Sequence, residues 1–197
     1  MSSGMKAAVV VIAVAVIGTV VIVAGGGQKG TGARGPTPGK ATPPFAAPLA
    51  LSNLVGDANI APDACSVADR RALVSCRAFA KGPVALAFVS VGDKPCTEML
   101  PALERAGRSI PGLTAAAIGI RGKRPALAKL AATNPGVEVA WDRDGALTNR
   151  YGVAVCPTVV VVREGGIVAE SLIGEALDDP EVLTSSIRRA LAGTSTG

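Results

Sequence analysis

The sequence predicts an α/β domain built as a three-layer sandwich, with a central mixed sheet between flanking helices. Between residues 84 and 157, apolar strand-like runs alternate with segments of helical spacing, which is typical of parallel βαβ units. Two further apolar runs, 158–163 and 167–173, flank the turn 164–166, whose Glu-Gly-Gly sequence predicts a hairpin of antiparallel strands. A last helical pattern follows the hairpin and completes the domain.

The individual elements follow from the spacing of apolar residues. Continuous apolar runs predict strands at 84–90, 113–120, 137–142, 158–163 and 167–173. Apolar residues three and four positions apart predict helices at 97–109, 125–133, 147–151 and 179–192. Upstream of these, Ser66 is expected to cap a further short helix over 67–79. The order over residues 83–192 is therefore β-α-β-α-β-α-β-β-α.

The N-terminal region carries a strongly apolar segment. Residues 7–24 contain no charged side chain and are long enough to cross a hydrocarbon core as a helix. We expect a single-pass transmembrane helix that contacts the lipid bilayer of the cell membrane, with residues 1–6 in the cytoplasm and the rest of the chain exported. A cleaved signal peptide is the alternative, because Ala24 and Gly26 offer small residues for a cleavage site.

The distribution of positive charge around this segment favours the opposite orientation. Lys6 precedes the segment, whereas Lys29, Arg34 and Lys40 follow it, and basic residues usually stay on the cytoplasmic side. The cysteines downstream and the linker that leads to them fit an exported domain instead. We predict the extracytoplasmic location on that ground.

Composition divides the remainder of the chain. Residues 25–48 are rich in Gly and Pro, which predicts a flexible tether. Residues 49–82 are expected to form an N-terminal extension that contains Cys65 and Cys76. The domain proper spans 83–192, and 193–197 are expected to form a disordered tail.

Charge and residue usage exclude several functions. The net charge is +5, but Lys and Arg are scattered and aromatic residues make up only 3%, so no nucleic-acid surface is expected. The chain has no His, which removes the usual general base and the commonest metal ligand. We therefore expect no metal site and no cofactor, and we expect the domain to be a monomer.

The four cysteines are Cys65, Cys76, Cys96 and Cys156. An even number fits disulfides in an oxidising compartment. Four cysteines allow three pairings, and the sequence alone does not choose between them.

Three stretches resemble the TlpA/ResA-type membrane-anchored thioredoxins, whose fold overlaps with that of the peroxiredoxins. Residues 82–104, GPVALAFVSVGDKPCTEMLPALE, resemble the first strand, active-site turn and first helix. Residues 141–153, WDRDGALTNRYGV, resemble the segment ahead of the last strands. Residues 151–168, YGVAVCPTVVVVREGGIV, resemble the stretch in which Thr follows a cis-proline and leads into the hairpin. The resemblance implies a thioredoxin-like fold for residues 83–192.

The sequence departs from this pattern at the position of the attacking cysteine. The family's Cys-x-x-Cys falls on residues 93–96, where only Cys96 is retained and Asp93 replaces the first cysteine. A carboxylate cannot carry out thiol–disulfide exchange, which needs a thiolate. Asp93 is expected to cap the following helix by accepting a hydrogen bond from the Cys96 N–H. A role as proton acceptor for a nearby thiol is the alternative.

Cys156 is a gain relative to the family pattern. It precedes Pro157, which the resemblance marks as the cis-proline of the substrate loop. In this fold that loop packs against the active-site turn, so the resemblance implies that Cys96 and Cys156 are neighbours. They could form a redox pair, a permanent disulfide or two buried thiols. Cys65 and Cys76 would then form a structural disulfide.

Two functions of different classes remain open. The first is a thiol–disulfide oxidoreductase acting on exported thiol and disulfide proteins, in which Cys156 attacks and Cys96 resolves the mixed disulfide. The second is an inactive thioredoxin-like domain that binds a protein partner. A peroxidase is less favoured, because Val89 and Asp93 stand where peroxiredoxins need Pro and a hydroxyl residue.

Overall fold

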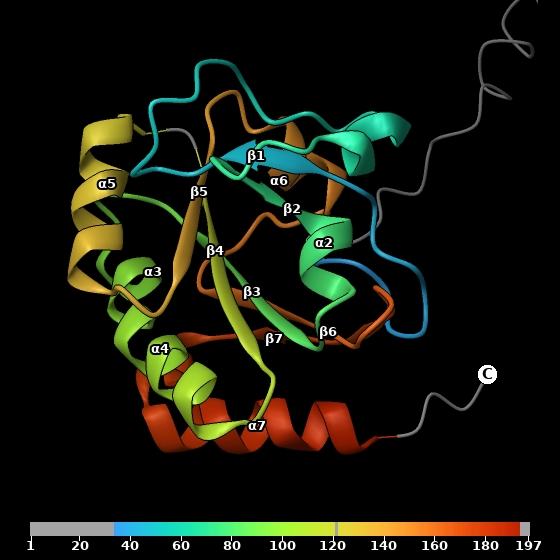
Figure 1. Cartoon of the computed structure of the whole chain (residues 1–197). Helices are drawn as coiled ribbons and strands as arrows, with labels where there is room; N and C mark the ends of the chain where they lie inside the picture. Colours follow the sequence, from blue (N-terminus) through green and yellow to red (C-terminus); the bar gives the residue numbers. More distant parts are fainter. Residues whose placement is uncertain (1–33, 121, 194–197) are drawn as a thin grey trace, which may run out of the picture. The chain divides into compact units, whose positions relative to one another are not determined.

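The computed structural model describes residues 34–120 and 122–193. A central sheet has the strand order β5-β4-β3-β6-β7 (Figure 1). Strands β3, β4 and β5 run parallel, whereas β6 is antiparallel to both of its neighbours. The strands span Val84–Val89 (β3), Thr114–Ile120 (β4), Glu138–Asp142 (β5), Thr158–Val162 (β6) and Val168–Ile173 (β7). The predicted mixed α/β sheet is confirmed.

Helices cover both faces of this sheet, and α7 runs along its lower side in the view of Figure 1, next to α4. The α-helices span Ser75–Phe79 (α2), Lys94–Glu98 (α3), Leu100–Ser109 (α4), Arg124–Thr133 (α5), Ala146–Arg150 (α6) and Pro180–Ala192 (α7). Two short 3-10 helices, Pro62–Ser66 and Glu175–Asp178, lie in the connections. The order of elements follows the sequence prediction, apart from three local differences described below.

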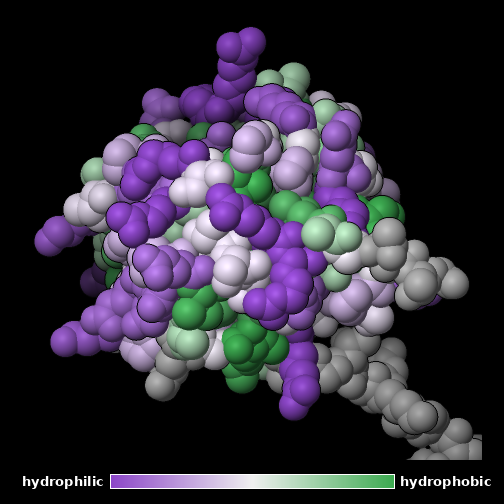
Figure 2. Space-filling model, turned by 90° about the horizontal axis from the view of Figure 1, so that it is seen from below, coloured by the Kyte–Doolittle hydropathy of each residue, from purple (hydrophilic) through white to green (hydrophobic). Residues whose placement is uncertain are grey.

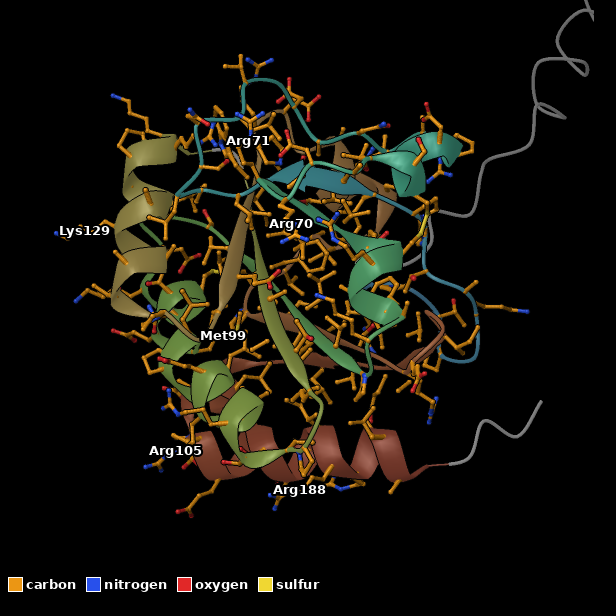
Figure 3. The ribbon with its side chains drawn as sticks, in the orientation of Figure 1. Arg70, Arg71, Met99, Arg105, Lys129 and Arg188 are labelled. Carbon is orange, nitrogen blue, oxygen red and sulfur yellow. A yellow bond between two sulfur atoms is a disulfide. The ribbon has the colours of Figure 1, made fainter. Side chains whose placement is uncertain are left out.

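The helix expected over 97–109 is broken in two. Helix α3 ends at Glu98 and α4 begins at Leu100, with Met99 between them. The cause is Pro101, which has no N–H to donate to the carbonyl four residues earlier and so interrupts the hydrogen-bond ladder. Met99 is fully buried at the break (Figure 3).

The core has one layer on each face of the sheet, and the central strand β3 is buried on both. Ala85, Ala87 and Val89 face a cluster with buried residues of α4, α5 and α7. Leu86 and Phe88 face the other cluster, which includes Tyr151. This second cluster also takes in residues upstream of the domain, so the domain extends further towards the N-terminus than its sequence pattern indicates.

The prediction of a flexible tether is wrong for residues 34–48. Phe45 is only 1% exposed, and Ala46–Pro48 forms strand β1, which pairs with β2 (Ala72–Val74). Ahead of β1, Lys40 O accepts a hydrogen bond from Val168 N on the edge strand β7. Apolar residues and free sheet edges therefore outweigh the Gly and Pro content of this stretch. Residues 25–33 of the predicted tether lie outside the described residues.

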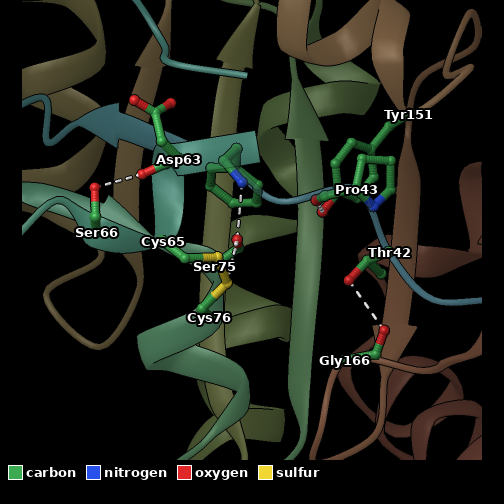
Figure 4. Close-up of a disulfide and its surroundings, with 10 residues drawn as sticks. Thr42, Pro43, Asp63, Cys65, Ser66, Ser75, Cys76, Tyr151 and Gly166 are labelled. Atoms are coloured by element: carbon green, nitrogen blue, oxygen red, sulfur yellow. Dashed lines mark hydrogen bonds between the residues drawn. A yellow bond between two sulfur atoms is a disulfide. The ribbon is translucent and has the colours of Figure 1, made fainter. Parts of the chain in front are cut away.

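The helix expected over 67–79 is also corrected. Residues 72–74 form strand β2 instead, and the helix starts only at Ser75. Ser66 lies at the end of a 3-10 helix, where its hydroxyl donates to the carbonyl of Asp63 (Figure 4). Pairing with β1 decides the outcome, because the partner strand is distant in sequence and invisible to a local pattern.

Arg124 fastens the N-terminal extension to the domain. Its guanidinium donates to the carbonyl oxygens of Leu49 at 2.7 Å, Leu54 at 2.5 Å and Ala50 at 3.4 Å, and to the Ser52 hydroxyl at 2.9 Å. It also stacks 5.7 Å from the ring centre of Trp141. The extension over 49–82 is therefore an integral layer of the domain.

The outer surface of the domain on the α7 side is largely hydrophilic, with apolar side chains in small separate patches (Figure 2). Within 34–120 and 122–193, no helix has the length and apolar character needed to cross a membrane. The predicted transmembrane helix over 7–24 lies outside the described residues, as do residues 1–6 and 194–197.

Candidate redox site

The sheet register brings Cys96 and Cys156 together. Phe88, near the end of β3, pairs with Thr158, the first residue of β6. Because the strands are antiparallel, the turn that leaves β3 and the loop that enters β6 meet at one end of the sheet. Cys96 lies just after that turn, in α3, and Cys156 lies in that loop. Their Cα atoms are 5.3 Å apart and their sulfur atoms are bonded, across 60 residues of sequence.

The two sulfur atoms differ in access. Cys96 is fully buried, whereas Cys156 is partly exposed. Cys156 Sγ lies 3.3 Å from the carbonyl oxygen of Phe88, which can accept a hydrogen bond from the Cys156 thiol once the disulfide is reduced. Of the two cysteines, Cys156 is therefore the more accessible from solvent.

Residues 155–158 form a defined bend around Cys156. The peptide bond between Cys156 and Pro157 is cis, and Pro157 is buried. The hydroxyl of Thr158 donates to the carbonyl of Val155 at 2.7 Å, which closes the bend around the cysteine. Cys156 is thus presented at the start of a buried strand.

A cleft of about 640 Å³ opens beside the disulfide. The lining residues come from the turn after β3, the end of β4, the start of α6 and the loop ahead of Cys156. Its lining comprises Ser90, Asp93, Ile120, Asp144, Gly145, Ala146, Thr148, Asn149, Val153, Ala154, Val155 and Cys156. Cys96 is not part of the lining, in keeping with its burial.

Asp93 occupies the expected position but does not make the expected bond. It is the residue before α3, yet its carboxylate accepts no capping hydrogen bond, and the bond expected from the Cys96 N–H is absent. Pro95, in the first turn, has no N–H to offer, and the turn is closed instead by Thr97, whose N–H donates to Asp93 O at 3.3 Å. The Asp93 side chain is exposed and lines the cleft.

Asp142 is a residue of the site that the sequence analysis did not single out. It is fully buried at the end of β5. Its carboxylate accepts hydrogen bonds from the N–H groups of Leu147 and Thr148 at 3.2 and 2.8 Å, and from the Thr148 hydroxyl at 2.6 Å. It thereby holds the start of α6, which forms one wall of the cleft. A Thr six residues after an Asp at a strand end is too weak a signal to have indicated this.

Cys65 and Cys76 form a second disulfide on another part of the surface, with Cα atoms 5.5 Å apart (Figure 4). Cys65 is exposed and Cys76 is partly buried. The neighbouring Ser75 hydroxyl accepts a hydrogen bond from the Phe45 N–H at 2.8 Å. This bridge therefore ties the start of α2 to the connection that precedes β2, next to the segment that enters β1.

Tyr151 fixes the second core beneath the site. Its ring lies 5.5 Å from that of Phe88 and 5.9 Å from that of Phe45. Its hydroxyl donates to the carbonyl of Pro43 at 3.0 Å. Burial is the main cause that raises the pKa of Tyr151, and a hydrogen bond with Thr42 opposes it.

Within the described residues, no group of three or more His, Cys, Asp and Glu side chains is arranged to hold a metal ion.

Solved structures with the same architecture include several thiol–disulfide proteins. A protein assigned as the thiol:disulfide interchange protein DsbE of Chlorobium tepidum has a TM-score of 0.60 and 22% identity, covering 79% of this chain and 99% of that one. A thiol:disulfide interchange protein from Bacteroides sp. has a TM-score of 0.56 and 12% identity, covering 82% and 94%. The peroxidoxin BcpB of Mycobacterium tuberculosis has a TM-score of 0.57 and 15% identity, covering 79% and 98%.

These likenesses define the class of fold: the domain is thioredoxin-like. No protein-family model matches the sequence, and no curated protein matches it either.

Proposed function

We propose that this protein is a thiol–disulfide oxidoreductase of the TlpA/ResA type in which Cys96 and Cys156 replace the usual Cys-x-x-Cys pair. The observation that carries the proposal is the bond between these two sulfurs, with Cys156 open to a cleft and Cys96 buried behind it. Asp93 stands where the family has its attacking cysteine, so exchange has to begin elsewhere.

The exposed sulfur defines the order of steps. A substrate thiolate attacks Cys156 Sγ, a mixed disulfide forms, and the Cys96 sulfur leaves as a thiolate and takes up a proton. A second substrate thiolate then attacks the mixed disulfide, and the oxidised substrate and reduced Cys156 separate. In the reverse direction, Cys156 attacks a substrate disulfide and Cys96 resolves the mixed species.

The proposed location is the extracytoplasmic side of the membrane, with residues 7–24 as the anchor. A chain with two disulfides suits an oxidising compartment. Since residues 34–48 belong to the domain, only residues 25–33 remain as a spacer. Exported thiol proteins near the bilayer are the proposed substrates.

A catalytically silent, partner-binding domain is the second candidate, and the loss of the family's attacking cysteine at Asp93 is the observation that favours it. The reduction potential of Cys96–Cys156 separates the two. Equilibration against glutathione, followed by alkylation and mass spectrometry of each cysteine, gives the potential of each disulfide separately. A Cys96–Cys156 potential above about −250 mV supports exchange, and one below about −300 mV supports a structural bridge.

Trapping variants give an independent test. With Cys96→Ser, the resolving sulfur is removed, so Cys156 is expected to accumulate mixed disulfides with substrate proteins. The matched variant Cys156→Ser leaves only the buried Cys96 and is expected to trap far less. Failure of both variants to capture any protein would contradict the oxidoreductase.

A further inference from the structure

We infer that the charge of the cleft selects substrates whose cysteine is flanked by Lys or Arg. This inference rests on the proposed function, because it concerns the thiols that reach Cys156. Asp93 and Asp144 both line the cleft that contains Cys156. No Lys or Arg is among the described residues of that lining.

Both carboxylates belong to residues that line the cleft and have oxygen atoms available to a substrate. Asp93 makes no hydrogen bond or ion pair through its side chain within the described residues. Asp144 uses one oxygen, Oδ1, to accept from the N–H of Ala146 at 2.9 Å, and its second oxygen makes no such bond. Both side chains are exposed, so a substrate can approach them.

Among the described residues, the cations nearest in sequence to the two carboxylates lie outside the cleft lining. Arg143, next to Asp144 in sequence, forms an ion pair with Asp57. Lys94 and Arg150 are exposed, and neither lines the cleft. The remaining lining is polar or apolar without charge, through residues such as Ser90, Asn149 and Val155.

The chemistry of exchange makes this local charge matter. The attacking species is a thiolate, and two carboxylates at the entrance repel it. Cationic residues beside the substrate cysteine offset that repulsion as the thiolate nears Cys156. The whole chain has a net charge of +5, so general attraction would favour an anionic substrate instead. A measured preference for cationic substrates would therefore come from the local charge of the cleft and not from the net charge of the chain.

The test uses two short peptide thiols, Gly-Lys-Cys-Lys-Gly and Gly-Glu-Cys-Glu-Gly. Each peptide thiolate attacks Cys156 of the oxidised full chain and releases Cys96. After acid quenching and denaturation, free Cys96 is counted by alkylation and mass spectrometry, so reduction of Cys65–Cys76 does not interfere. Rates are expressed per thiolate. For each protein, the rate with the Lys peptide is divided by the rate with the Glu peptide. This ratio is compared between three proteins: the natural chain, the double variant Asp93→Asn/Asp144→Asn, and the control variant Glu164→Gln. Glu164 is exposed at the other end of β6.

For the natural chain we expect a ratio of about ten at an ionic strength near 0.01 M, falling towards one at about 0.5 M. The double variant is expected to lose most of the preference at low salt, and Glu164→Gln to keep it. If the natural chain reacts with both peptides at a ratio near one, or if the double variant keeps the full ratio, charge selection is contradicted. The proposed oxidoreductase activity is not contradicted by either result. No reaction with either peptide would overturn both.

Discussion

Phe88 of β3 pairs with Thr158 of β6, and this single register position places the Cys96 turn against the Cys156 loop. The hydroxyl of Thr158 closes the loop by donating to Val155 O, and the carbonyl of Phe88 lies 3.3 Å from Cys156 Sγ. The sulfur pair is therefore positioned by two adjacent central strands, which are the most rigid support that this fold offers.

Removal of the Asp93 charge is expected to make the Cys96–Cys156 disulfide easier to reduce. Reduction places negative charge on sulfur, and a nearby carboxylate disfavours that charge. For Asp93→Asn we expect the potential to rise by about 10–20 mV, a modest shift because Asp93 is exposed and screened. Equilibration with glutathione measures it. Glu164→Gln serves as the control, and an equal shift there would contradict the explanation.

Loss of the Arg124 guanidinium is expected to weaken attachment of the extension. Arg124→Ala removes hydrogen bonds to three backbone carbonyls and one hydroxyl, together with the contact on Trp141. We expect the free energy of unfolding to fall by about 2–3 kcal/mol, measured by urea titration with both disulfides intact. Lys129→Ala, an exposed position on the same helix (Figure 3), should cost less than about 0.5 kcal/mol. Similar losses for the two variants would sink the prediction.

Asp142 is expected to matter more for stability than its neighbour Asp144. Asp142→Ala leaves two N–H groups and the Thr148 hydroxyl without their buried acceptor. We expect a loss of about 3 kcal/mol in the free energy of unfolding. Asp144→Ala removes one exposed hydrogen bond and should cost about 1 kcal/mol or less. The same urea titration compares them, and a smaller loss for Asp142→Ala would show that its carboxylate is dispensable.

The ionisation of Tyr151 at alkaline pH can be followed without overlap from other residues of its kind, because it is the only tyrosine in the chain. Burial raises its pKa in the folded state, so tyrosinate absorbance should not develop near pH 10, where free tyrosine ionises. The unfolded chain ionises there while the folded one stays neutral, so this stabilising contribution is present below about pH 10 and is lost as pH rises further. Spectrophotometric titration of native and urea-unfolded protein checks both points.

The variant Tyr151→Phe is the matched control for that titration. It keeps the ring between Phe45 and Phe88 but loses the hydrogen bond to Pro43 O. We expect this loss to lower the free energy of unfolding by about 1 kcal/mol. The difference in stability between the two proteins should shrink as pH rises above 10. A native tyrosine that titrates near pH 10 would contradict the buried environment.

Local patterns predicted the elements of the sheet well and failed at the N-terminal side. The runs at 84–90 and 158–163 became β3 and β6 within a residue or so, because a buried strand is visible as a continuous apolar segment. The segment 34–48 was interpreted as a tether because its Gly and Pro content hides the contacts of Phe45 and β1. The break at Met99 was readable from Pro101, yet the apolar spacing of 97–109 concealed it.

The candidate site was also only partly predictable from the sequence. Asp93, Cys96 and Pro157 could be placed at the ends of predicted elements, whereas the burial of Asp142 and the missing cap at Asp93 could not. By itself the sequence determined which segments between residues 84 and 192 are strands and helices, apart from the break at Met99, since periodicity and turn chemistry are short-range. Only the tertiary structure decided that Cys96 bonds to Cys156 and that Cys156 lines a cleft with two carboxylates, because strand order joins residues 60 positions apart.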